Sequence, residues 1–233
     1  MSKETAVVLG ATGLCGEHLL KSAVASQAFE KVYSISRRSL PYVADCEQIV
    51  DKDSSSWASL LPKENFKFLF TSLATTRAAA GGFDKQYQID HDLNLELAKA
   101  SKANGCETIV LVSSTGANKN SWMPYLRMKG EIEEDIIALN FKHTIILRPS
   151  ALLGDRRDHH KGFGNDLFVK IGNCFYRSRL QSIMGYPVQG EEVGIAGVQA
   201  ALQEAEKNTE SPTVRYVGSS EILELVDNFK NNS

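Results

Sequence analysis

The stretch Ala6–Leu20, AVVLGATGLCGEHLL, constrains the fold more than any other part of the chain. A short apolar run ends at Gly10, further glycines follow at Gly13 and Gly16, and an apolar pattern of helical spacing then resumes. A strand that leads through a glycine-rich turn into a helix is typical of the start of a dinucleotide-binding βαβ unit. The pattern therefore predicts a phosphate-binding turn, with a glycine-rich turn that binds nothing as the alternative.

Each glycine has its own physical role in such a turn. Gly10 lets the chain turn tightly off the strand, Gly13 removes a side chain where the backbone approaches a pyrophosphate, and Gly16 lets the helix lie close to the sheet. The first turn of the helix then offers free N–H groups and a partial positive charge to the phosphates.

Short β-branched runs alternate with helical patterns as far as Arg148. The expected strands are 5–9, 31–36, 47–50, 66–72, 108–114 and 143–148, and the expected helices are 13–26, 54–61, 83–104 and 124–139. This alternation predicts an α/β fold, a Rossmann-like doubly wound parallel sheet with helices on both faces. We expect one domain over 1–233, in which 149–233 form a small C-terminal elaboration on the substrate side.

Composition narrows the possible function classes. Of the 233 residues, 42% are hydrophobic, which is enough for a sizeable core, and the formal net charge of -2 argues against an extended basic surface for nucleic acid. The adjacent His159 and His160 point their side chains apart, so we expect no metal site. Scattered cysteines predict free thiols in a reducing compartment. They are Cys15, Cys46, Cys106 and Cys174.

No membrane-spanning segment is expected. The longest apolar runs, such as TIVLV, fall far short of the roughly 20 residues that a spanning helix needs. Residues 1–4 leave no room for a secretory signal before the first apolar run, and no Arg-rich presequence is present. Any contact with a membrane is therefore expected to be peripheral.

The end of the second strand predicts which dinucleotide is bound. It reads Ser36-Arg37-Arg38, where an acidic residue would bind the ribose 2′-hydroxyl of NAD. Two guanidinium groups suit a 2′-phosphate, which predicts NADP(H), whereas two solvated arginines are the alternative.

Two more strand ends supply further candidate contacts. Asp51, after the third strand, is placed to accept a hydrogen bond from the adenine amino group. The turn after the fourth strand is rich in small residues, and Leu73, Ala74 and Thr75 are expected to line the nicotinamide ribose, mainly through backbone atoms.

The reacting groups are expected after the fifth strand. Tyr125 and Lys129 are four residues apart on a predicted helix, so their side chains share one face. A lysine ammonium stabilises phenolate and lowers the pKa of a tyrosine, which can then exchange a proton with a carbonyl oxygen near neutral pH. Ser113 or Ser114 could bind the same oxygen. A Tyr–Lys pair alone is a weak signal, because such pairs are frequent on solvated helix faces.

The chain resembles the atypical short-chain dehydrogenase/reductases in the segments GATGLCG, SRR, SLATTRAAAGG, LVSSTGA, YLRMKGEIEEDI and ILRPSALLGDR. More narrowly, it is similar to the fungal mitochondrial outer-membrane branch, which is related to the Tat-interacting protein oxidoreductase. The resemblance spans nearly the whole chain. It implies a Rossmann-like fold, NADP(H) binding and a Ser–Tyr–Lys site.

The resemblance also implies roles for individual residues. The 2′-phosphate falls on Arg37 and Arg38, the proton donor is Tyr125, Lys129 grips the cofactor, and the segment around Leu152 closes over the nicotinamide. The phosphate loop falls on Gly10, Thr12, Gly13, Leu14, Cys15 and Gly16.

The chain departs from the family pattern in places. Members often read Arg-Pro-Gly where this chain has Ser150 after Arg-Pro, and larger relatives carry an asparagine near the position of Asp90, with Asn94 one turn further on. A proton relay through that helix is therefore in doubt. The region after Arg148 is also short for the sugar-nucleotide pocket of the epimerase relatives.

These observations favour an NADPH-dependent reductase of a small carbonyl substrate. The alternative is an NADP(H)-binding regulatory or scaffold protein with little or no catalysis, and a nucleotide-sugar epimerase is disfavoured. The resemblance further implies a cytosol-facing, peripheral position on the mitochondrial outer membrane. The sequence does not predict the physiological substrate or the oligomeric state.

Overall fold

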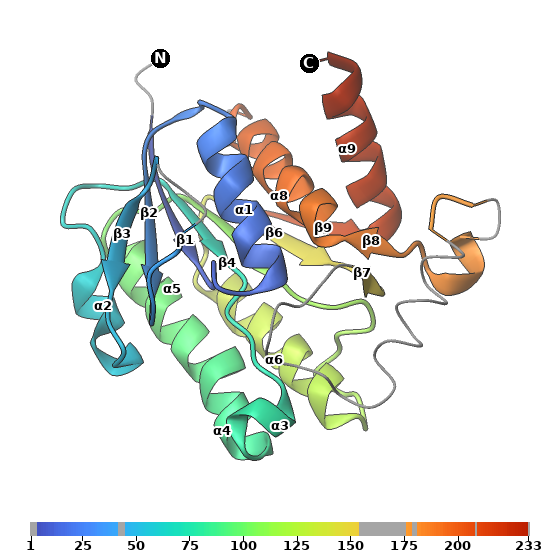
Figure 1. The fold of residues 1–233 in the computed structure, drawn as a ribbon, viewed down its shortest axis with the longest axis horizontal. Helices are drawn as coiled ribbons and strands as arrows, with labels where there is room; N and C mark the ends of the chain where they lie inside the picture. Colours follow the sequence, from blue (N-terminus) through green and yellow to red (C-terminus); the bar gives the residue numbers. More distant parts are fainter. Residues whose placement is uncertain (1–3, 42–44, 154–175, 179–180, 208, 233) are drawn as a thin grey trace.

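A computed structural model of the protein describes residues 4–41, 45–153, 176–178, 181–207 and 209–232. Its centre is a seven-stranded parallel sheet in the order β3-β2-β1-β4-β5-β6-β9 (Figure 1). The strands are β1 Glu4–Leu9, β2 Phe29–Ser36, β3 Glu47–Val50, β4 Phe68–Thr71, β5 Thr108–Val112, β6 His143–Arg148 and β9 Thr213–Gly218. The strand order reverses between β1 and β4, and ligands of such sheets bind at this switch point.

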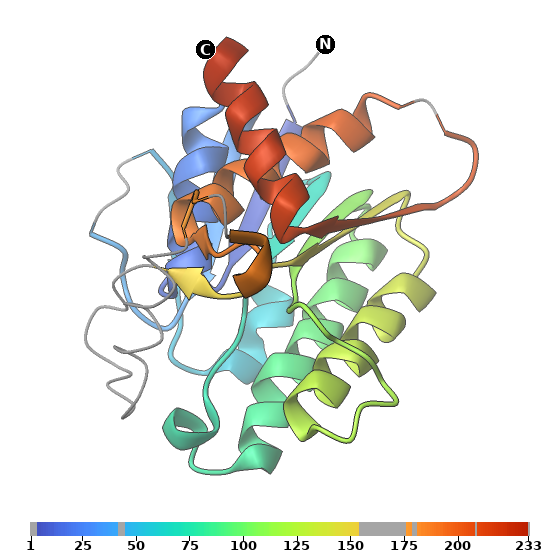
Figure 2. The ribbon, with the colours of Figure 1, turned by 90° about the vertical axis from the view of Figure 1, so that its right-hand side faces the viewer.

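Helices cover both faces of the sheet, which lies between two helical layers (Figure 2). One layer contains α1 Leu14–Ala25, α8 Gly190–Ala205 and α9 Ser219–Asn232. The other contains α2 Trp57–Leu60, α5 Asn94–Ala103 and α6 Pro124–Ala138. Shorter elements are η1 Ser54–Ser56, α3 Arg77–Ala80, α4 Phe83–Tyr87, η2 Gln88–Leu93, η3 Gln181–Met184, and the paired strands β7 Leu152–Leu153 and β8 Val188–Gln189.

Apolar strands explain why the sheet is covered on both sides. In β1, Ala6 and Val8 face the core beneath α1, α8 and α9, whereas Val7 and Leu9 face the core beneath α2, α5 and α6. Successive side chains of a strand point to opposite faces, so a continuous apolar run fills both cores.

The position of α1 depends on its close contact with α8. A Cβ atom on Gly190 would lie 2.7 Å from Cγ of Leu14, and one on Gly194 would lie 2.5 Å from the carbonyl carbon of His18. Larger residues at these positions would force the helices apart. The glycines of α8 therefore help to set where α1 begins, at the end of β1.

The predicted doubly wound parallel sheet is confirmed. The strands expected over 66–72 and 108–114 are shorter, since the chain leaves the sheet after Thr71 and Val112. The helix expected over 83–104 runs through α4, η2 and α5, but its η2 part is a π-helix. Within 149–233, β9 extends the main sheet, and α8 and α9 cover one of its faces.

Candidate functional site

The turn after β1 has the geometry that its glycines predict. Gly10 has φ +81°, and a Cβ atom there would lie 2.7 Å from the carbonyl carbon of Ser72. A Cβ atom on Gly16 would lie only 2.1 Å from the carbonyl oxygen of Gly10. Packing within the chain therefore demands glycine at both positions. At Gly13 the nearest atom would lie 3.4 Å away, an ordinary contact, so the fold itself does not require glycine there.

The first turn of α1 presents backbone N–H groups toward this loop. Gly13 is the N-cap residue, and among the described residues no side chain caps it. Thr12 and Gly13 are exposed, Leu14 is half-buried, and Cys15 is buried. Uncapped N–H groups at the start of a long helix suit an anion, and phosphate groups are the common occupants.

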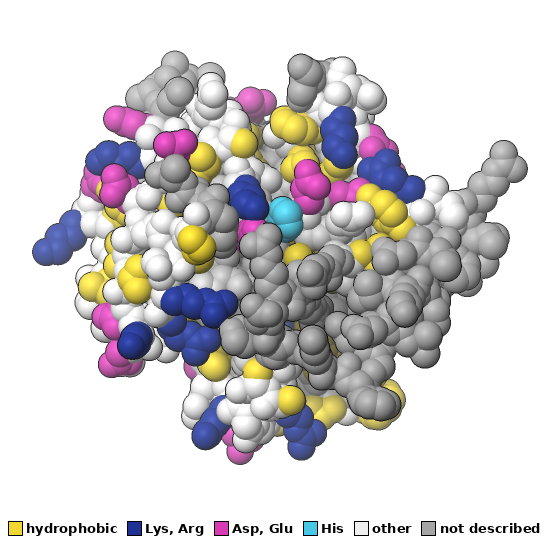
Figure 3. Space-filling model, viewed as in Figure 1, with side chains coloured by type: hydrophobic (Ala, Val, Ile, Leu, Met, Phe, Trp, Pro, Cys, Tyr) yellow, Lys and Arg dark blue, Asp and Glu magenta, His cyan; other side chains and the backbone are white. Residues whose placement is uncertain are grey.

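Two arginines follow β2, the neighbour of β1 in the sheet. The hydroxyl of Ser36 donates a 2.7 Å hydrogen bond to the carbonyl oxygen of Arg38, and Arg37 and Arg38 are both exposed. Figure 3 shows basic side chains gathered near the carboxyl ends of β1 and β2, beside the atoms drawn in grey. Exposed guanidinium groups at this position could bind an anion such as a phosphate.

The carboxylate of Asp51 stabilises the turn after β3. Its Oδ1 accepts a 2.8 Å hydrogen bond from the N–H of Asp53, and its Oδ2 accepts a 2.9 Å bond from the hydroxyl of Ser56. An adenine contact would compete with these local bonds, and it stays a prediction.

The turn after β4 is bound by the helix that follows it. The carbonyl oxygen of Leu73 accepts a 2.9 Å hydrogen bond from Asn94, and the N–H of Thr75 donates a 2.7 Å bond to Oδ1 of Asp90. Ala74, between them, is exposed. The backbone groups that were expected to meet a ribose thus also bind two side chains of η2 and α5.

Two of the predicted reacting residues, Lys129 and Ser113, lie together at the end of β5. Lys129 is only 2% exposed, and its ammonium donates a 3.1 Å hydrogen bond to the carbonyl oxygen of Val112. The next residue, Ser113, is buried, and its hydroxyl has no hydrogen-bond partner among the described residues. Ser114 is half-buried and donates to the carbonyl oxygen of Thr115 at 3.3 Å.

Tyr125 lies at the start of α6, one turn before Lys129, and is 41% exposed. The helix thus holds a solvent-facing phenol and a buried ammonium on neighbouring turns. That arrangement could place a substrate oxygen at the surface while the lysine stays inside.

Asp90 lies beside the turn after β4, in a position that the sequence did not reveal. Its side chain is fully buried, and burial raises the pKa of its carboxyl to about 6, against the attraction of Lys129 and the hydrogen bond from Thr75. Burial lowers the pKa of Lys129, and attraction to Asp90 opposes this effect. The sequence indicated this residue only by placing an aspartate near the position where larger relatives carry an asparagine.

Other candidate residues have simpler positions. Leu152 lies in β7, half-buried against the core beneath α1 and α8, and its proposed place over the nicotinamide stays a prediction. Cys15, Cys46 and Cys106 are free thiols, as expected. Cys174 and the pair 159–160 lie outside the described residues.

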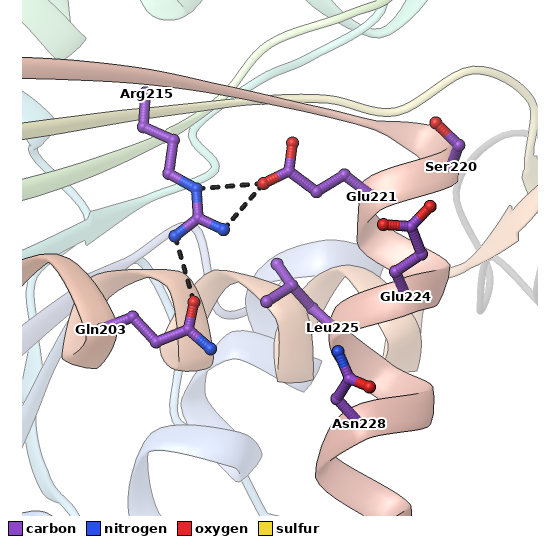
Figure 4. Close-up of a pocket in the computed structure, with 7 residues that line it drawn as sticks. All are labelled: Gln203, Arg215, Ser220, Glu221, Glu224, Leu225 and Asn228. Atoms are coloured by element: carbon purple, nitrogen blue, oxygen red, sulfur yellow. Dashed lines mark hydrogen bonds and ion pairs between the residues drawn. The ribbon is translucent and has the colours of Figure 1, made fainter.

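Two surface hollows lie away from the glycine turn. The larger, of about 370 Å³, lies between α8, β9 and α9 (Figure 4). Its arginine, Arg215, is bound by Glu221 and by Gln203, so the hollow offers no free cation to a ligand. The smaller, of about 310 Å³, lies beside α6 and includes Arg148, which is bound by Glu133.

Close relatives match almost the whole chain. The protein FMP52 of Kluyveromyces lactis is 53% identical over 225 residues, which cover 95% of this chain and 98% of the relative. The chain belongs to the FMP52 family. Its member from Saccharomyces cerevisiae is 54% identical over 223 residues, 94% of this chain and 95% of that protein. Both FMP52 relatives are named as mitochondrial, and a model of the HIM1 family also matches residues 64–176.

Solved structures resemble the FMP52 fold at low sequence identity. MoeE5 in complex with UDP-glucose and NAD superposes with a TM-score of 0.64 at 18% identity, covering 98% of this chain and 82% of MoeE5. A short-chain dehydrogenase from Streptomyces avermitilis gives a TM-score of 0.58 at 16% identity, covering 99% of this chain and 94% of that one. These likenesses show a Rossmann-like fold.

Among the described residues of this FMP52 family member, no helix combines the length and apolar character that crossing a bilayer requires.

Proposed function

We propose that the protein is an NADP(H)-dependent oxidoreductase of the short-chain dehydrogenase/reductase type that reduces a small carbonyl compound. The observation that carries the proposal is the buried Lys129, which binds the end of β5 next to Ser113, one helical turn from Tyr125. A buried ammonium beside a hydroxyl that has no partner among the described residues destabilises a fold, and a ligand that completes the contacts would explain why both are kept.

The residues present fit a dinucleotide. The uncapped start of α1 and the open backbone of Gly13 suit a pyrophosphate, and the exposed Arg37 and Arg38 suit a 2′-phosphate. MoeE5, which shares the fold, was solved with NAD, and this likeness supports a nicotinamide dinucleotide here. The preference for NADP(H) rests on the arginines.

Each group of the site has a proposed task. Bound NADPH would supply the hydride. Tyr125 gives a proton to the carbonyl oxygen, and Ser113 or Ser114 orients that oxygen. The charge of Lys129 stabilises the phenolate form of Tyr125 that results. Asp51 would bind the adenine, and Leu152 would lie near the nicotinamide together with the turn from Leu73 through Ala74 to Thr75.

The test begins with the purified full-length chain. NADPH and NADH are titrated, and a panel of aldehydes and ketones is then screened with NADPH for the wild type and for Tyr125→Phe. Turnover that depends on Tyr125 supports the proposal. Tight NADPH binding without turnover of any carbonyl would favour the alternative, a regulatory or scaffold protein that binds the cofactor.

We further propose that the protein is mitochondrial, because its close relatives carry that designation. A peripheral place on the cytosolic side of the outer membrane, and kinship with the Tat-interacting protein, stay predictions of the sequence motifs. Fractionation of mitochondria followed by protease protection tests the location.

A further inference from the structure

We infer that Asp90 is a positioning residue of the proposed site: its carboxylate is the buried counter-ion that keeps Lys129 charged. This inference rests on the proposed function only where cofactor binding is the readout. The pairing of the two side chains is tested separately, without any cofactor.

The placement of Asp90 is the first argument. It lies in the π-helical segment η2, is fully buried, and accepts a 2.7 Å hydrogen bond from the N–H of Thr75 through Oδ1. Its Oδ2 is buried and has no hydrogen-bond partner within the described part of the chain. π-helical turns are rare and frequently occur at functional sites.

The second argument is that the other groups near Lys129 are poor counter-ions. Besides Asp90 from η2, the groups that act on its charge are Glu133 from its own helix α6 and Cys15 from α1. Glu133 is already bound by Arg148 through Nε at 3.1 Å and through Nη2. Cys15 offers a thiol. Asp90 is therefore the carboxylate available to Lys129.

The third argument is energetic. Because burial raises the pKa of Asp90 to about 6, an ionised Asp90 at neutral pH makes the fold less stable than a neutral side chain of the same shape. A buried carboxylate that lowers the stability of the fold can be retained where its negative charge is needed at a functional site. Here the negative charge of Asp90 favours the charged form of Lys129, whose pKa is lowered by burial.

Asp90→Asn separates charge from shape. The amide keeps an oxygen that can accept from the N–H of Thr75, but it removes the negative charge beside Lys129. The first experiment measures thermal unfolding at pH 8, without cofactor, for Asp90→Asn, Lys129→Met and the double variant. Should Lys129→Met not fold, Lys129→Gln takes its place.

We expect Asp90→Asn to raise the unfolding temperature, and to raise it further in the Lys129→Met background, where an ionised Asp90 has no counter-ion. Glu204→Gln is the matched control, because Glu204 is also buried but is paired with Lys207 and Arg215. Its effect should be the same with and without Lys129. Equal shifts for Asp90→Asn in both backgrounds would overturn the pairing.

The second experiment measures the NADPH dissociation constant between pH 6 and pH 10. With Lys129 as a cofactor contact, affinity is lost when its ammonium loses the proton. If Asp90 is the counter-ion of Lys129, its removal should lower the pKa of Lys129 by roughly one unit or more, so the alkaline loss of affinity should begin that much earlier in Asp90→Asn. Coincident curves would contradict the inference. A wild type that binds no NADPH would refute the proposed function, while the unfolding cycle still decides the pairing.

Discussion

The ammonium of Lys129 donates a hydrogen bond to the carbonyl oxygen of Val112 across 3.1 Å. This bond joins the middle of α6 to the last residue of β5, where the chain turns into Ser113. The contact ties α6 to the sheet at the residue that precedes Ser113. The end of β5 and α6 thus hold Lys129 and Ser113 close together.

Tyr125→Phe should abolish carbonyl reduction and leave NADPH binding nearly intact, because the ring remains and only the transferable proton is removed. General acid–base groups contribute about 10²–10⁴-fold to a rate, so steady-state kinetics with NADPH should show a loss of that size. An unchanged rate would contradict the assigned chemistry. Alanine substitutions at Ser113 and Ser114 are expected to differ strongly from each other, since neighbouring strand residues point to opposite sides.

Arg37→Ala and Arg38→Ala should each weaken NADPH binding about tenfold or more, because a charge-assisted hydrogen bond is worth about 1.5–3 kcal/mol. NADH lacks the 2′-phosphate, so its affinity should stay the same in both variants. Titrations of both nucleotides against wild type and variants measure this difference. Equal wild-type affinity for NADH and NADPH would refute the proposed 2′-phosphate contact.

Two alanine substitutions in the glycine turn should differ in which property they change, the stability of the fold or the binding of NADPH. Gly16→Ala places a Cβ atom 2.1 Å from the carbonyl oxygen of Gly10, so it should destabilise the fold by about 1–3 kcal/mol or more. Gly13→Ala meets only an ordinary 3.4 Å contact, so its unfolding free energy should change little. If Gly13 faces a pyrophosphate, Gly13→Ala should nevertheless weaken NADPH binding. Urea denaturation and titration give the two readouts.

The fold was predictable because local patterns decide it. The strand, glycine turn and helix of Ala6–Leu20 and the apolar runs through β5 and β6 specify a buried parallel sheet without reference to distant contacts. The positions of Tyr125 and Lys129 on one helix followed from spacing alone.

The rest of the site could not be read from the sequence because it depends on contacts between distant segments. The π-helical turn in η2 is invisible to a 3.6-residue periodicity, and it carries Asp90 toward the turn after β4. Burial of Lys129 is likewise a product of tertiary structure, since an isolated lysine on a helix is normally solvated. The local bonds of Asp51 were missed because its position at a strand end suggested a ligand contact.

Membrane association, if present, should be peripheral. The sequence motifs predict a peripheral position, in which case carbonate extraction of mitochondrial membranes should release the protein into the supernatant. An integral outer-membrane protein in the same sample serves as the control that stays in the pellet. Retention of this chain with that control would count against peripheral binding unless a lipid modification is found.

The stability of the wild type relative to Asp90→Asn should depend on pH between about 4 and 6. In the unfolded chain an aspartate ionises near pH 3.9, whereas burial holds the pKa of Asp90 at about 6 in the fold. Between these two pKa values Asp90 is protonated in the folded state and ionised in the unfolded chain. The free energy of unfolding of the wild type therefore falls as the pH rises through this window. The difference between the two pKa values corresponds to roughly 2–3 kcal/mol of stability. Asp90→Asn cannot ionise and therefore does not lose this stability as the pH rises.

Urea denaturation at pH 4, 5, 6 and 7 measures this dependence, because titrating groups distant from position 90 contribute equally to both proteins and cancel in the difference. The variant should gain stability relative to the wild type up to about pH 6, and the gap should then stay constant. A gap that is the same at pH 4 and pH 7 would mean that Asp90 ionises as easily in the fold as in the unfolded chain. In that case its carboxylate would carry no cost, and the energetic argument for its role beside Lys129 would fail.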